Sequence, residues 1–141
     1  MRLVLTGTGQ MGQAVATVVA EGPHEIVARF NSSQPFLEAD PAAVSEADLA
    51  IDFSLPRLAV PHLRRYCAAS LPVVMGTTGW YEAIEEVQAL VRTHEASVLY
   101  APNFSIGVAV LSRAVDRVTA LMDALDDYDA FVQELHHTKK A

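Results

Sequence analysis

Near its amino terminus the sequence contains a glycine-rich segment whose spacing suits the binding of phosphate. The pattern G-x-G-x-x-G is formed by Gly7, Thr8, Gly9, Gln10, Met11 and Gly12. In a strand–turn–helix unit, the first glycine permits a tight turn, the second lets the backbone approach a pyrophosphate, and the third allows close helix packing. Free amides at the start of the helix then receive the negative charge. The segment therefore predicts a dinucleotide site; the alternative is a turn that only shapes the backbone.

The residues after the second predicted strand should influence which dinucleotide is bound. An acidic residue there would bond the ribose hydroxyls of NAD and repel the 2′-phosphate of NADP. The sequence has Asn31 and Ser32 at this position, close to Arg29, and no acid. We therefore expect NADPH or NADH as the cofactor, with NADPH tolerated. The alternative is that these are ordinary polar residues of a loop.

Three further segments lie at the carboxyl ends of predicted strands, at the edge where open α/β sheets bind ligands. They are 52–54, which contains Phe53; 76–79, which contains Gly76, Thr77 and Thr78; and 101–105, which contains Ala101, Asn103 and Phe104. Taken separately, each is also explained as a turn before a capped helix, with Ser105 as the cap of a long helix.

Close to the carboxyl terminus, adjacent histidines are followed by lysines, at His136, His137, Lys139 and Lys140. An imidazole titrates near neutrality, so this segment could transfer protons. It could also be a metal-binding pair, a solvated charged tail or the remnant of a tag. On spacing alone, a solvated tail is the best interpretation.

Apolar runs alternate with helical periodicity along the chain and predict the scaffold that positions these segments. Strands are predicted at 2–6, 25–30, 47–53, 72–75 and 97–100, and helices at 11–20, 57–69, 81–94 and 105–125. Pro35 and Pro41 make 31–46 a loop or a broken helix. Because parallel neighbours need helical crossovers, the alternation predicts an α/β fold with a doubly wound, mostly parallel Rossmann sheet.

Composition argues against several other classes of protein. The 141 residues are 51% hydrophobic and 19% charged, which is a globular composition. A net charge of −7 with scattered basic residues argues against a nucleic-acid partner. The apolar runs are too short for a membrane span or a signal peptide, so we expect no membrane partner and a cytoplasmic location. The single cysteine, Cys67, cannot form an internal disulfide or a zinc site, and we expect no metal.

Taken together, these segments resemble the dihydrodipicolinate reductase family, also called 4-hydroxy-tetrahydrodipicolinate reductase, and they occur in the family's order. The resemblance spans the whole chain. It rests on G-x-G-x-M-G at 7–12, Asp-Phe-Ser at 52–54, Gly-Thr-Thr-Gly at 76–79, Ala-Pro-Asn-Phe-Ser-Ile-Gly-Val at 101–108 and Glu-x-His-His-x-x-Lys at 134–140. The last two motifs are much more specific than the glycine turn, and they replace the interpretation of the histidines as a tail.

The resemblance implies an oxidoreductase of diaminopimelate and lysine biosynthesis. Such an enzyme delivers hydride from NADPH or NADH to a cyclic imine dicarboxylate, a small-molecule partner. The family's pattern implies that His136 is the acid or base, that Lys140 is the second proton donor or a carboxylate anchor, and that His137 helps to bind the substrate carboxylates. It also implies cofactor contacts: Gly76 and Thr78 beside the nicotinamide, and Asn103 and Phe104 in the cofactor cleft. Cationic groups near a dicarboxylate would offset the cost of its desolvation.

The chain departs from the family pattern in its length, because family members are much longer and their last motif continues into a substrate-binding segment. We therefore expect a fragment, with a dinucleotide-binding domain at 1–127 and the first strand of a second, α+β substrate domain at 128–141. For full-length members the resemblance implies a homotetramer. The alternatives are a complete dinucleotide-binding sensor or partner domain without catalysis, and another Rossmann enzyme acting on amino or imino acids.

Overall fold

The computed structural model describes residues 1–129, 131 and 133, and the chain divides into two units, 1–102 and 103–141. In the larger unit, five strands form one sheet in which all neighbours are parallel. The strands are β1 (Arg2–Thr6), β2 (Glu25–Phe30), β3 (Leu49–Asp52), β4 (Val73–Met75) and β5 (Val98–Tyr100). The predicted α/β class is confirmed, with strands that are equal to or slightly shorter than those expected.

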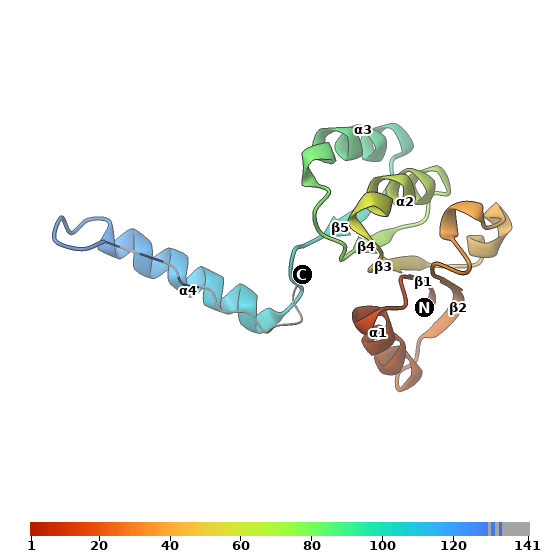
Figure 1. Ribbon diagram of the computed structural model, residues 1–141, viewed down its shortest axis with the longest axis horizontal. Coiled ribbons are helices and arrows are strands. Elements are labelled where there is room, and N and C mark those ends of the chain that lie inside the picture. The colour runs from red at the N-terminus through yellow and green to blue at the C-terminus, as the bar shows by residue number, and fades with distance from the viewer. Residues whose placement is uncertain (130, 132, 134–141) are drawn as a thin grey trace. The chain divides into compact units, whose positions relative to one another are not determined.

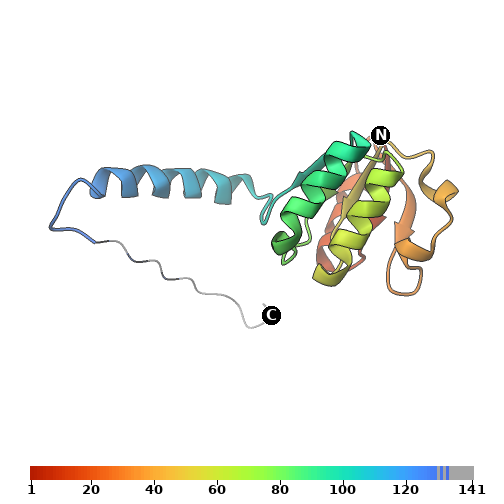
Figure 2. The ribbon, with the colours of Figure 1, turned by 90° about the horizontal axis from the view of Figure 1, so that it is seen from above.

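Helices cover both faces of this sheet (Figures 1 and 2). Helix α1 (Gln10–Ala20) lies on one face, and α2 (Pro56–Ala68) and α3 (Ile84–His94) lie side by side on the other. Between β2 and β3 the predicted loop contains two short 3-10 helices, η1 (Phe36–Glu38) and η2 (Pro41–Val44). Pro56 opens α2 because its fixed φ suits the first helical position.

The main core lies between the sheet and α2. Alternate residues of β3 and β4 are buried on this side, and they include Ala50, Val73 and Met75. Leu63 and Tyr66 of α2, both fully buried, belong to the same cluster. Because side chains alternate across a strand, the opposite residues of β3 and β4 face the other side and are only half-buried. This packing fixes α2 against the sheet and so positions the start of α2 at the sheet edge.

The strand order is β2-β1-β3-β4-β5, so the direction in which strands are added reverses between β1 and β3. Thr6 at the end of β1 pairs with Phe30 of β2 and with Asp52 of β3. The carboxyl ends of these three strands therefore meet at one edge. In open α/β sheets, ligands bind in the crevice at such a reversal.

The smaller unit contains helix α4 (Ile106–Met122). Ser105 caps it, since its Oγ accepts from the Val108 amide at 3.4 Å, and the predicted cap is confirmed. The strand predicted within 128–141 lies mostly outside the described residues, and the boundary expected after residue 127 stays a prediction. Among the described helices, none combines the length and the hydropathy that a membrane span requires.

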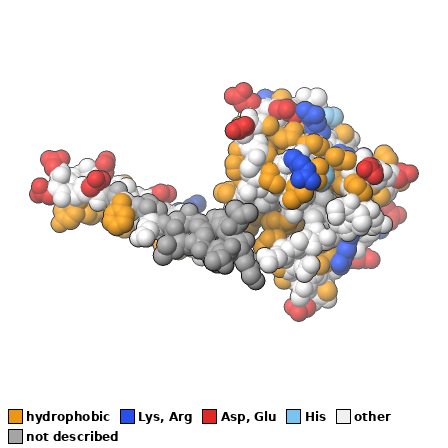
Figure 3. Space-filling view, in the orientation of Figure 1, with side chains coloured by type: hydrophobic (Ala, Val, Ile, Leu, Met, Phe, Trp, Pro, Cys, Tyr) orange, Lys and Arg blue, Asp and Glu red, His pale blue; other side chains and the backbone are white. Residues whose placement is uncertain are grey.

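Charged side chains do not form a single patch on the face of the larger unit drawn in Figure 3. Basic side chains lie there among acidic and apolar ones. In the larger unit, two exposed ion pairs join Arg2 to Glu46 and Arg64 to Glu86. We therefore expect an anionic ligand of this unit to be held by local groups and not by a broad basic surface.

Candidate functional site

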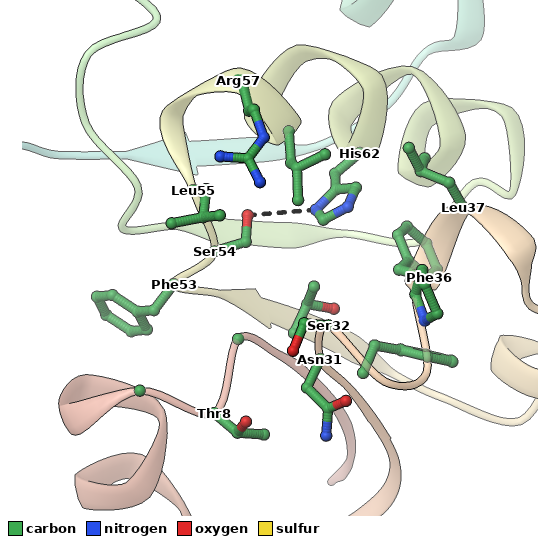
Figure 4. A pocket seen from close by; sticks show the side chains of 16 residues that line it. Thr8, Asn31, Ser32, Phe36, Leu37, Phe53, Ser54, Leu55, Arg57 and His62 are labelled. Atoms are coloured by element: carbon green, nitrogen blue, oxygen red, sulfur yellow. Dashed lines mark hydrogen bonds between the residues drawn. The ribbon is translucent and has the colours of Figure 1, made fainter.

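A cavity of about 490 Å³ opens at the edge where β2, β1 and β3 end. Its walls are the turn after β1, the end of β2, the η1 segment and the start of α2. The lining residues are 6–9, 30–32, 35–37, 53–55, 57, 58 and 62. In Figure 4, Asn31 and Ser32 lie across the cavity from Ser54 and His62. The volume lies in the range of small-molecule sites, and the structure brings Gly7, Thr8, Gly9, Asn31, Ser32 and Phe53 together around it.

The three glycines of the turn have different physical roles. Gly7 has φ +89°, and a Cβ there would lie 2.3 Å from the Phe53 carbonyl oxygen, so only glycine fits. A Cβ on Gly12 would lie 1.9 Å from the Gly7 carbonyl oxygen, so this glycine lets α1 pack against the turn. A Cβ on Gly9 would have no heavy atom within 4 Å. The turn is therefore shaped by Gly7 and Gly12, and Gly9 leaves open space beside it.

The amino terminus of α1 has no side-chain cap. Its first hydrogen bond runs from the Gln13 amide to the Gly9 carbonyl at 2.9 Å, and the Gln13 side chain donates to the Thr8 carbonyl at 3.2 Å. Gln10 and Met11, which were predicted to bind cofactor, form the first helical turn, beside the cavity and outside its lining. The amides of this turn need partners from outside the helix, so this end suits an anion.

The end of β2 is organised by Asn31. Its side-chain carbonyl accepts hydrogen bonds from the Ser33 amide at 2.8 Å, the Ser33 hydroxyl at 2.7 Å and the Gln34 amide at 3.0 Å. This turn is typical of asparagine in loops. Because its oxygen is used in this way, Asn31 has its side-chain NH₂ left to offer to a ligand.

Phe53 lies between two glycine turns. Its backbone touches the Gly7 position, and its ring occupies the space beside Gly76, where a Cβ would lie 2.1 Å from the Phe53 Cε1 atom. The turn after β4, with Gly76, Thr77 and Thr78, thus adjoins the cavity through Phe53 but does not line it. The cofactor contacts predicted for these residues stay predictions.

The remaining predicted residues are placed elsewhere. Ala101 follows β5 and does not line the cavity. Asn103 and Phe104 belong to the smaller unit, where the Asn103 side-chain oxygen accepts from the Ser105 amide at 2.7 Å. Their place in a cofactor cleft stays a prediction. The predicted catalytic and substrate residues His136, His137 and Lys140 lie outside the described residues.

A buried polar network beneath the cavity was not anticipated from the sequence. At its centre is the Asp52 carboxylate, which is fully buried. Oδ2 accepts from His62 Nδ1 at 2.8 Å and from the Tyr66 hydroxyl at 3.2 Å. Oδ1 accepts from the Ser54 amide at 2.9 Å and from the Thr77 hydroxyl at 3.4 Å. These four donors satisfy both oxygens of an ionised carboxylate.

The network joins β1, β3, α2 and the turn after β4. Because the Tyr66 proton goes to Asp52, the Thr6 hydroxyl donates to Tyr66, at 2.7 Å. Burial, followed by the charge of Asp52, raises the pKa of Tyr66 well above its usual value. The sequence did offer one signal, since Asp52 ends an otherwise apolar strand and His62 stands ten residues later among the apolar positions of a helix. These bonds hold the strand ends that form the floor of the cavity.

Among the described residues that line the cavity there is no carboxylate side chain and one arginine, Arg57. Asp52 lies beneath the lining, where its carboxylate accepts four hydrogen bonds. The cavity is therefore suited to an anionic ligand, even though the whole chain is acidic.

Comparison with known proteins identifies the relatives of the chain. The family model described as dihydrodipicolinate reductase, N-terminus, matches residues 1–104. The 4-hydroxy-tetrahydrodipicolinate reductase of Christiangramia forsetii is 31% identical over 140 residues, covering 99% of this chain and 57% of that protein. The enzyme of the same name from Staphylococcus haemolyticus is 37% identical over 147 residues, covering 99% of this chain and 58% of that protein.

Solved structures show the same fold. A dipicolinate-bound dihydrodipicolinate reductase from Paenisporosarcina sp. TG-14 aligns with a TM-score of 0.67 and 22% identity, over 89% of this chain and 54% of the other. A biliverdin reductase from Synechocystis sp. PCC 6803, in complex with biliverdin and NADP⁺, aligns with a TM-score of 0.57 and 18% identity, over 70% of this chain and 37% of the other.

The chain thus spans somewhat more than half the length of the curated relatives that it matches. The matched family model covers the sheet and every residue that lines the cavity. The chain belongs to the dihydrodipicolinate reductase family, and its first 104 residues correspond to the family's amino-terminal domain.

Proposed function

We propose that the chain is the cofactor-binding part of an NAD(P)H-dependent 4-hydroxy-tetrahydrodipicolinate reductase, an enzyme of diaminopimelate and lysine biosynthesis. The observation that carries this proposal is the cavity at the β1/β3 reversal, which combines an open glycine turn with a lining free of carboxylates. The family and the relatives that bear the reductase name support the reaction. The substrate class is a cyclic dicarboxylate, in keeping with the dipicolinate named for the similar structure.

The described residues fit a dinucleotide. The open space at Gly9 and the uncapped start of α1 would receive the pyrophosphate, because backbone amides there can donate to its oxygens. Ser32 and the amide group of Asn31 would face the ribose of the adenosine half. The ring of Phe53 and the turn at Gly76 would then border the nicotinamide.

Both NADPH and NADH are expected to bind. A carboxylate at the end of β2 would repel a 2′-phosphate, and the described residues of the cavity lining include none. Arg57, at the start of α2, supplies a positive charge to the same cavity, and no other described side chain is paired with it. NADPH is therefore accepted at least as well as NADH.

The bound nicotinamide supplies the hydride in this reaction. The substrate gains that hydride and a proton and loses water, while the cofactor leaves in its oxidised form. We propose His136 as the acid or base, Lys140 as the second proton donor or carboxylate anchor, and His137 as a substrate-binding residue. The binding of a dianionic substrate by such cations follows from the high cost of removing carboxylates from water.

The test of the binding step is a fluorescence titration of the 141-residue chain with NADPH and with NADH. Saturable binding of both is expected. Gly9→Asp should abolish binding, because the new carboxylate would occupy the place of the pyrophosphate. The fold should tolerate this change, since a Cβ at Gly9 has no heavy atom within 4 Å. Gly22→Asp is the matched control, because it adds the same charge after the end of α1. Absence of binding by the folded chain, or equal binding by Gly9→Asp, would refute the proposed site.

The reaction is tested separately by the loss of NADPH absorbance in the presence of 4-hydroxy-tetrahydrodipicolinate, with the second domain of the protein included. Oxidation of NADPH that depends on this substrate would support the reductase. Cofactor binding without any oxidation by that longer protein would favour a dinucleotide sensor.

A further inference from the structure

The imidazole of His62 is buried against the wall of the cavity, with only 4% of its side chain exposed. Its Nδ1 atom lies 2.8 Å from Asp52 Oδ2 and 3.3 Å from Ser54 Oγ. A carboxylate oxygen only accepts, so Nδ1 carries the proton and donates it to Asp52. In a neutral imidazole this arrangement leaves Nε2 without a proton, as an acceptor.

The Nε2 atom of His62 has no hydrogen-bond partner among the described residues. In the same part of the chain, no fully buried side-chain nitrogen or oxygen lacks a partner. Nε2 therefore keeps some contact with open space, and the open space that His62 borders is the cavity. Figure 4 shows the ring projecting from α2 towards the cavity, with Nδ1 turned to Ser54.

The part of the cavity near His62 is apolar and aromatic. The Phe36 ring lies 5.3 Å from the His62 ring, edge to face, and Leu37 and Leu58 complete this wall. Such a wall accommodates a flat heterocycle, since removing the faces of an aromatic ring from water costs little free energy. A heterocycle that also donates one hydrogen bond would satisfy Nε2.

We infer that His62 binds the adenine of the dinucleotide, with Nε2 accepting a hydrogen bond from the 6-amino group. This inference rests on the proposed function, because the cofactor supplies the adenine. The amino group is the donor on the adenine ring, and it lies at the end farthest from the ribose. With the ribose at the end of β2, the ring extends towards η1 and α2, where His62 stands.

Asp52 makes His62 selective. In the neutral imidazole, the carboxylate holds the proton on Nδ1, so Nε2 is an acceptor, which accepts from an amino group and repels a ring carbonyl oxygen. A purine with oxygen in place of the amino group would face Nε2 with an acceptor at position 6, and its N1–H donor lies one ring position away, so the bond made by the amino group is lost unless the ring shifts. An unmade buried hydrogen bond of this kind weakens binding by about tenfold.

The test compares NADH with reduced nicotinamide hypoxanthine dinucleotide, in which oxygen replaces the 6-amino group. The wild-type chain is expected to bind NADH about tenfold more tightly than the analogue. His62→Phe should bind both with similar affinity, because the preference depends on Nε2. Tyr66→Phe is the control: it also removes a donor from Asp52 but leaves Nε2 in place, so it should keep the preference.

The wild-type comparison decides the question even if His62→Phe does not fold. Equal affinity of the wild-type chain for the two dinucleotides would overturn the inference and leave the proposed function intact. A preference for the hypoxanthine analogue would also overturn it, since Nε2 would then be a donor. Failure of both dinucleotides to bind would refute the proposed function itself, and the inference with it.

Discussion

Replacing the first two glycines of the turn one at a time should separate folding from binding. Gly7→Ala places a methyl group 2.3 Å from the Phe53 carbonyl oxygen, in a residue with φ +89°. The positive φ costs about 1–2 kcal/mol for a residue with a Cβ, and overpacking against backbone costs about 1–3 kcal/mol. The free energy of unfolding should therefore fall by about 2–5 kcal/mol, out of the roughly 5–15 kcal/mol typical of a domain.

Gly9→Ala should behave differently. The new methyl group has no heavy atom within 4 Å, and the residue has φ −69°, which alanine adopts without strain. Alanine is a poorer N-cap than glycine, which lowers the free energy of unfolding. It also reduces the entropy of the unfolded chain, which raises that free energy by a comparable amount, so the net change should be less than about 1 kcal/mol. In the complex, the methyl group would meet the pyrophosphate, and an overpacking cost of about 1–3 kcal/mol corresponds to roughly 5- to 150-fold weaker NADPH binding.

Urea unfolding followed by tryptophan fluorescence measures the stability of the larger unit, since the single tryptophan, Trp80, is buried within it. NADPH titration of the folded variants measures binding. If Gly9→Ala lost as much stability as Gly7→Ala, or kept wild-type NADPH affinity, the division of roles between the two glycines would be wrong.

Three other outcomes are expected. Tyr66→Phe should lower the free energy of unfolding by about 1–2 kcal/mol at neutral pH. Burial raises the pKa of Tyr66, so above the usual tyrosine pKa of about 10 the unfolded chain releases a proton that the native chain keeps. Wild type should therefore lose stability as the pH rises above this value, and Tyr66→Phe should lose less; equal losses would contradict this role. Cys67 is buried and its thiol pKa is raised, so a thiol reagent should label it only on unfolding, and rapid labelling of the native chain would contradict its burial. Arg65 donates to the carbonyls of Leu37 in η1 and of Ala39 after it, and its guanidinium lies 5.1 Å from the Phe36 ring centre. Arg65→Met should therefore loosen the cavity wall at Phe36 and weaken NADH binding in titrations, whereas unchanged affinity would show that this wall does not depend on Arg65.

The sequence was informative wherever the cause of a structure is local. Periodicity along the chain predicted the strands and helices of the larger unit, and Ser105 was predicted correctly as the cap of α4. The glycine spacing placed the turn between β1 and α1, because a positive φ at Gly7 depends on neighbouring backbone. The order of the family motifs indicated the family, and the comparison confirmed it.

Only the tertiary structure decided which of these segments meet. Alternating strands and helices predict parallel neighbours, but the order β2-β1-β3-β4-β5 depends on packing between distant segments. That order brings Asn31 and Phe53 to one cavity and places Gly76 behind the Phe53 ring. The Asp52 network was missed for the same reason, since its partners are spread from β1 to the turn after β4 and form hydrogen bonds only after the strands are paired. Sequence by itself determined the local turns and the family, whereas long-range packing determined the cavity and the proton position on His62.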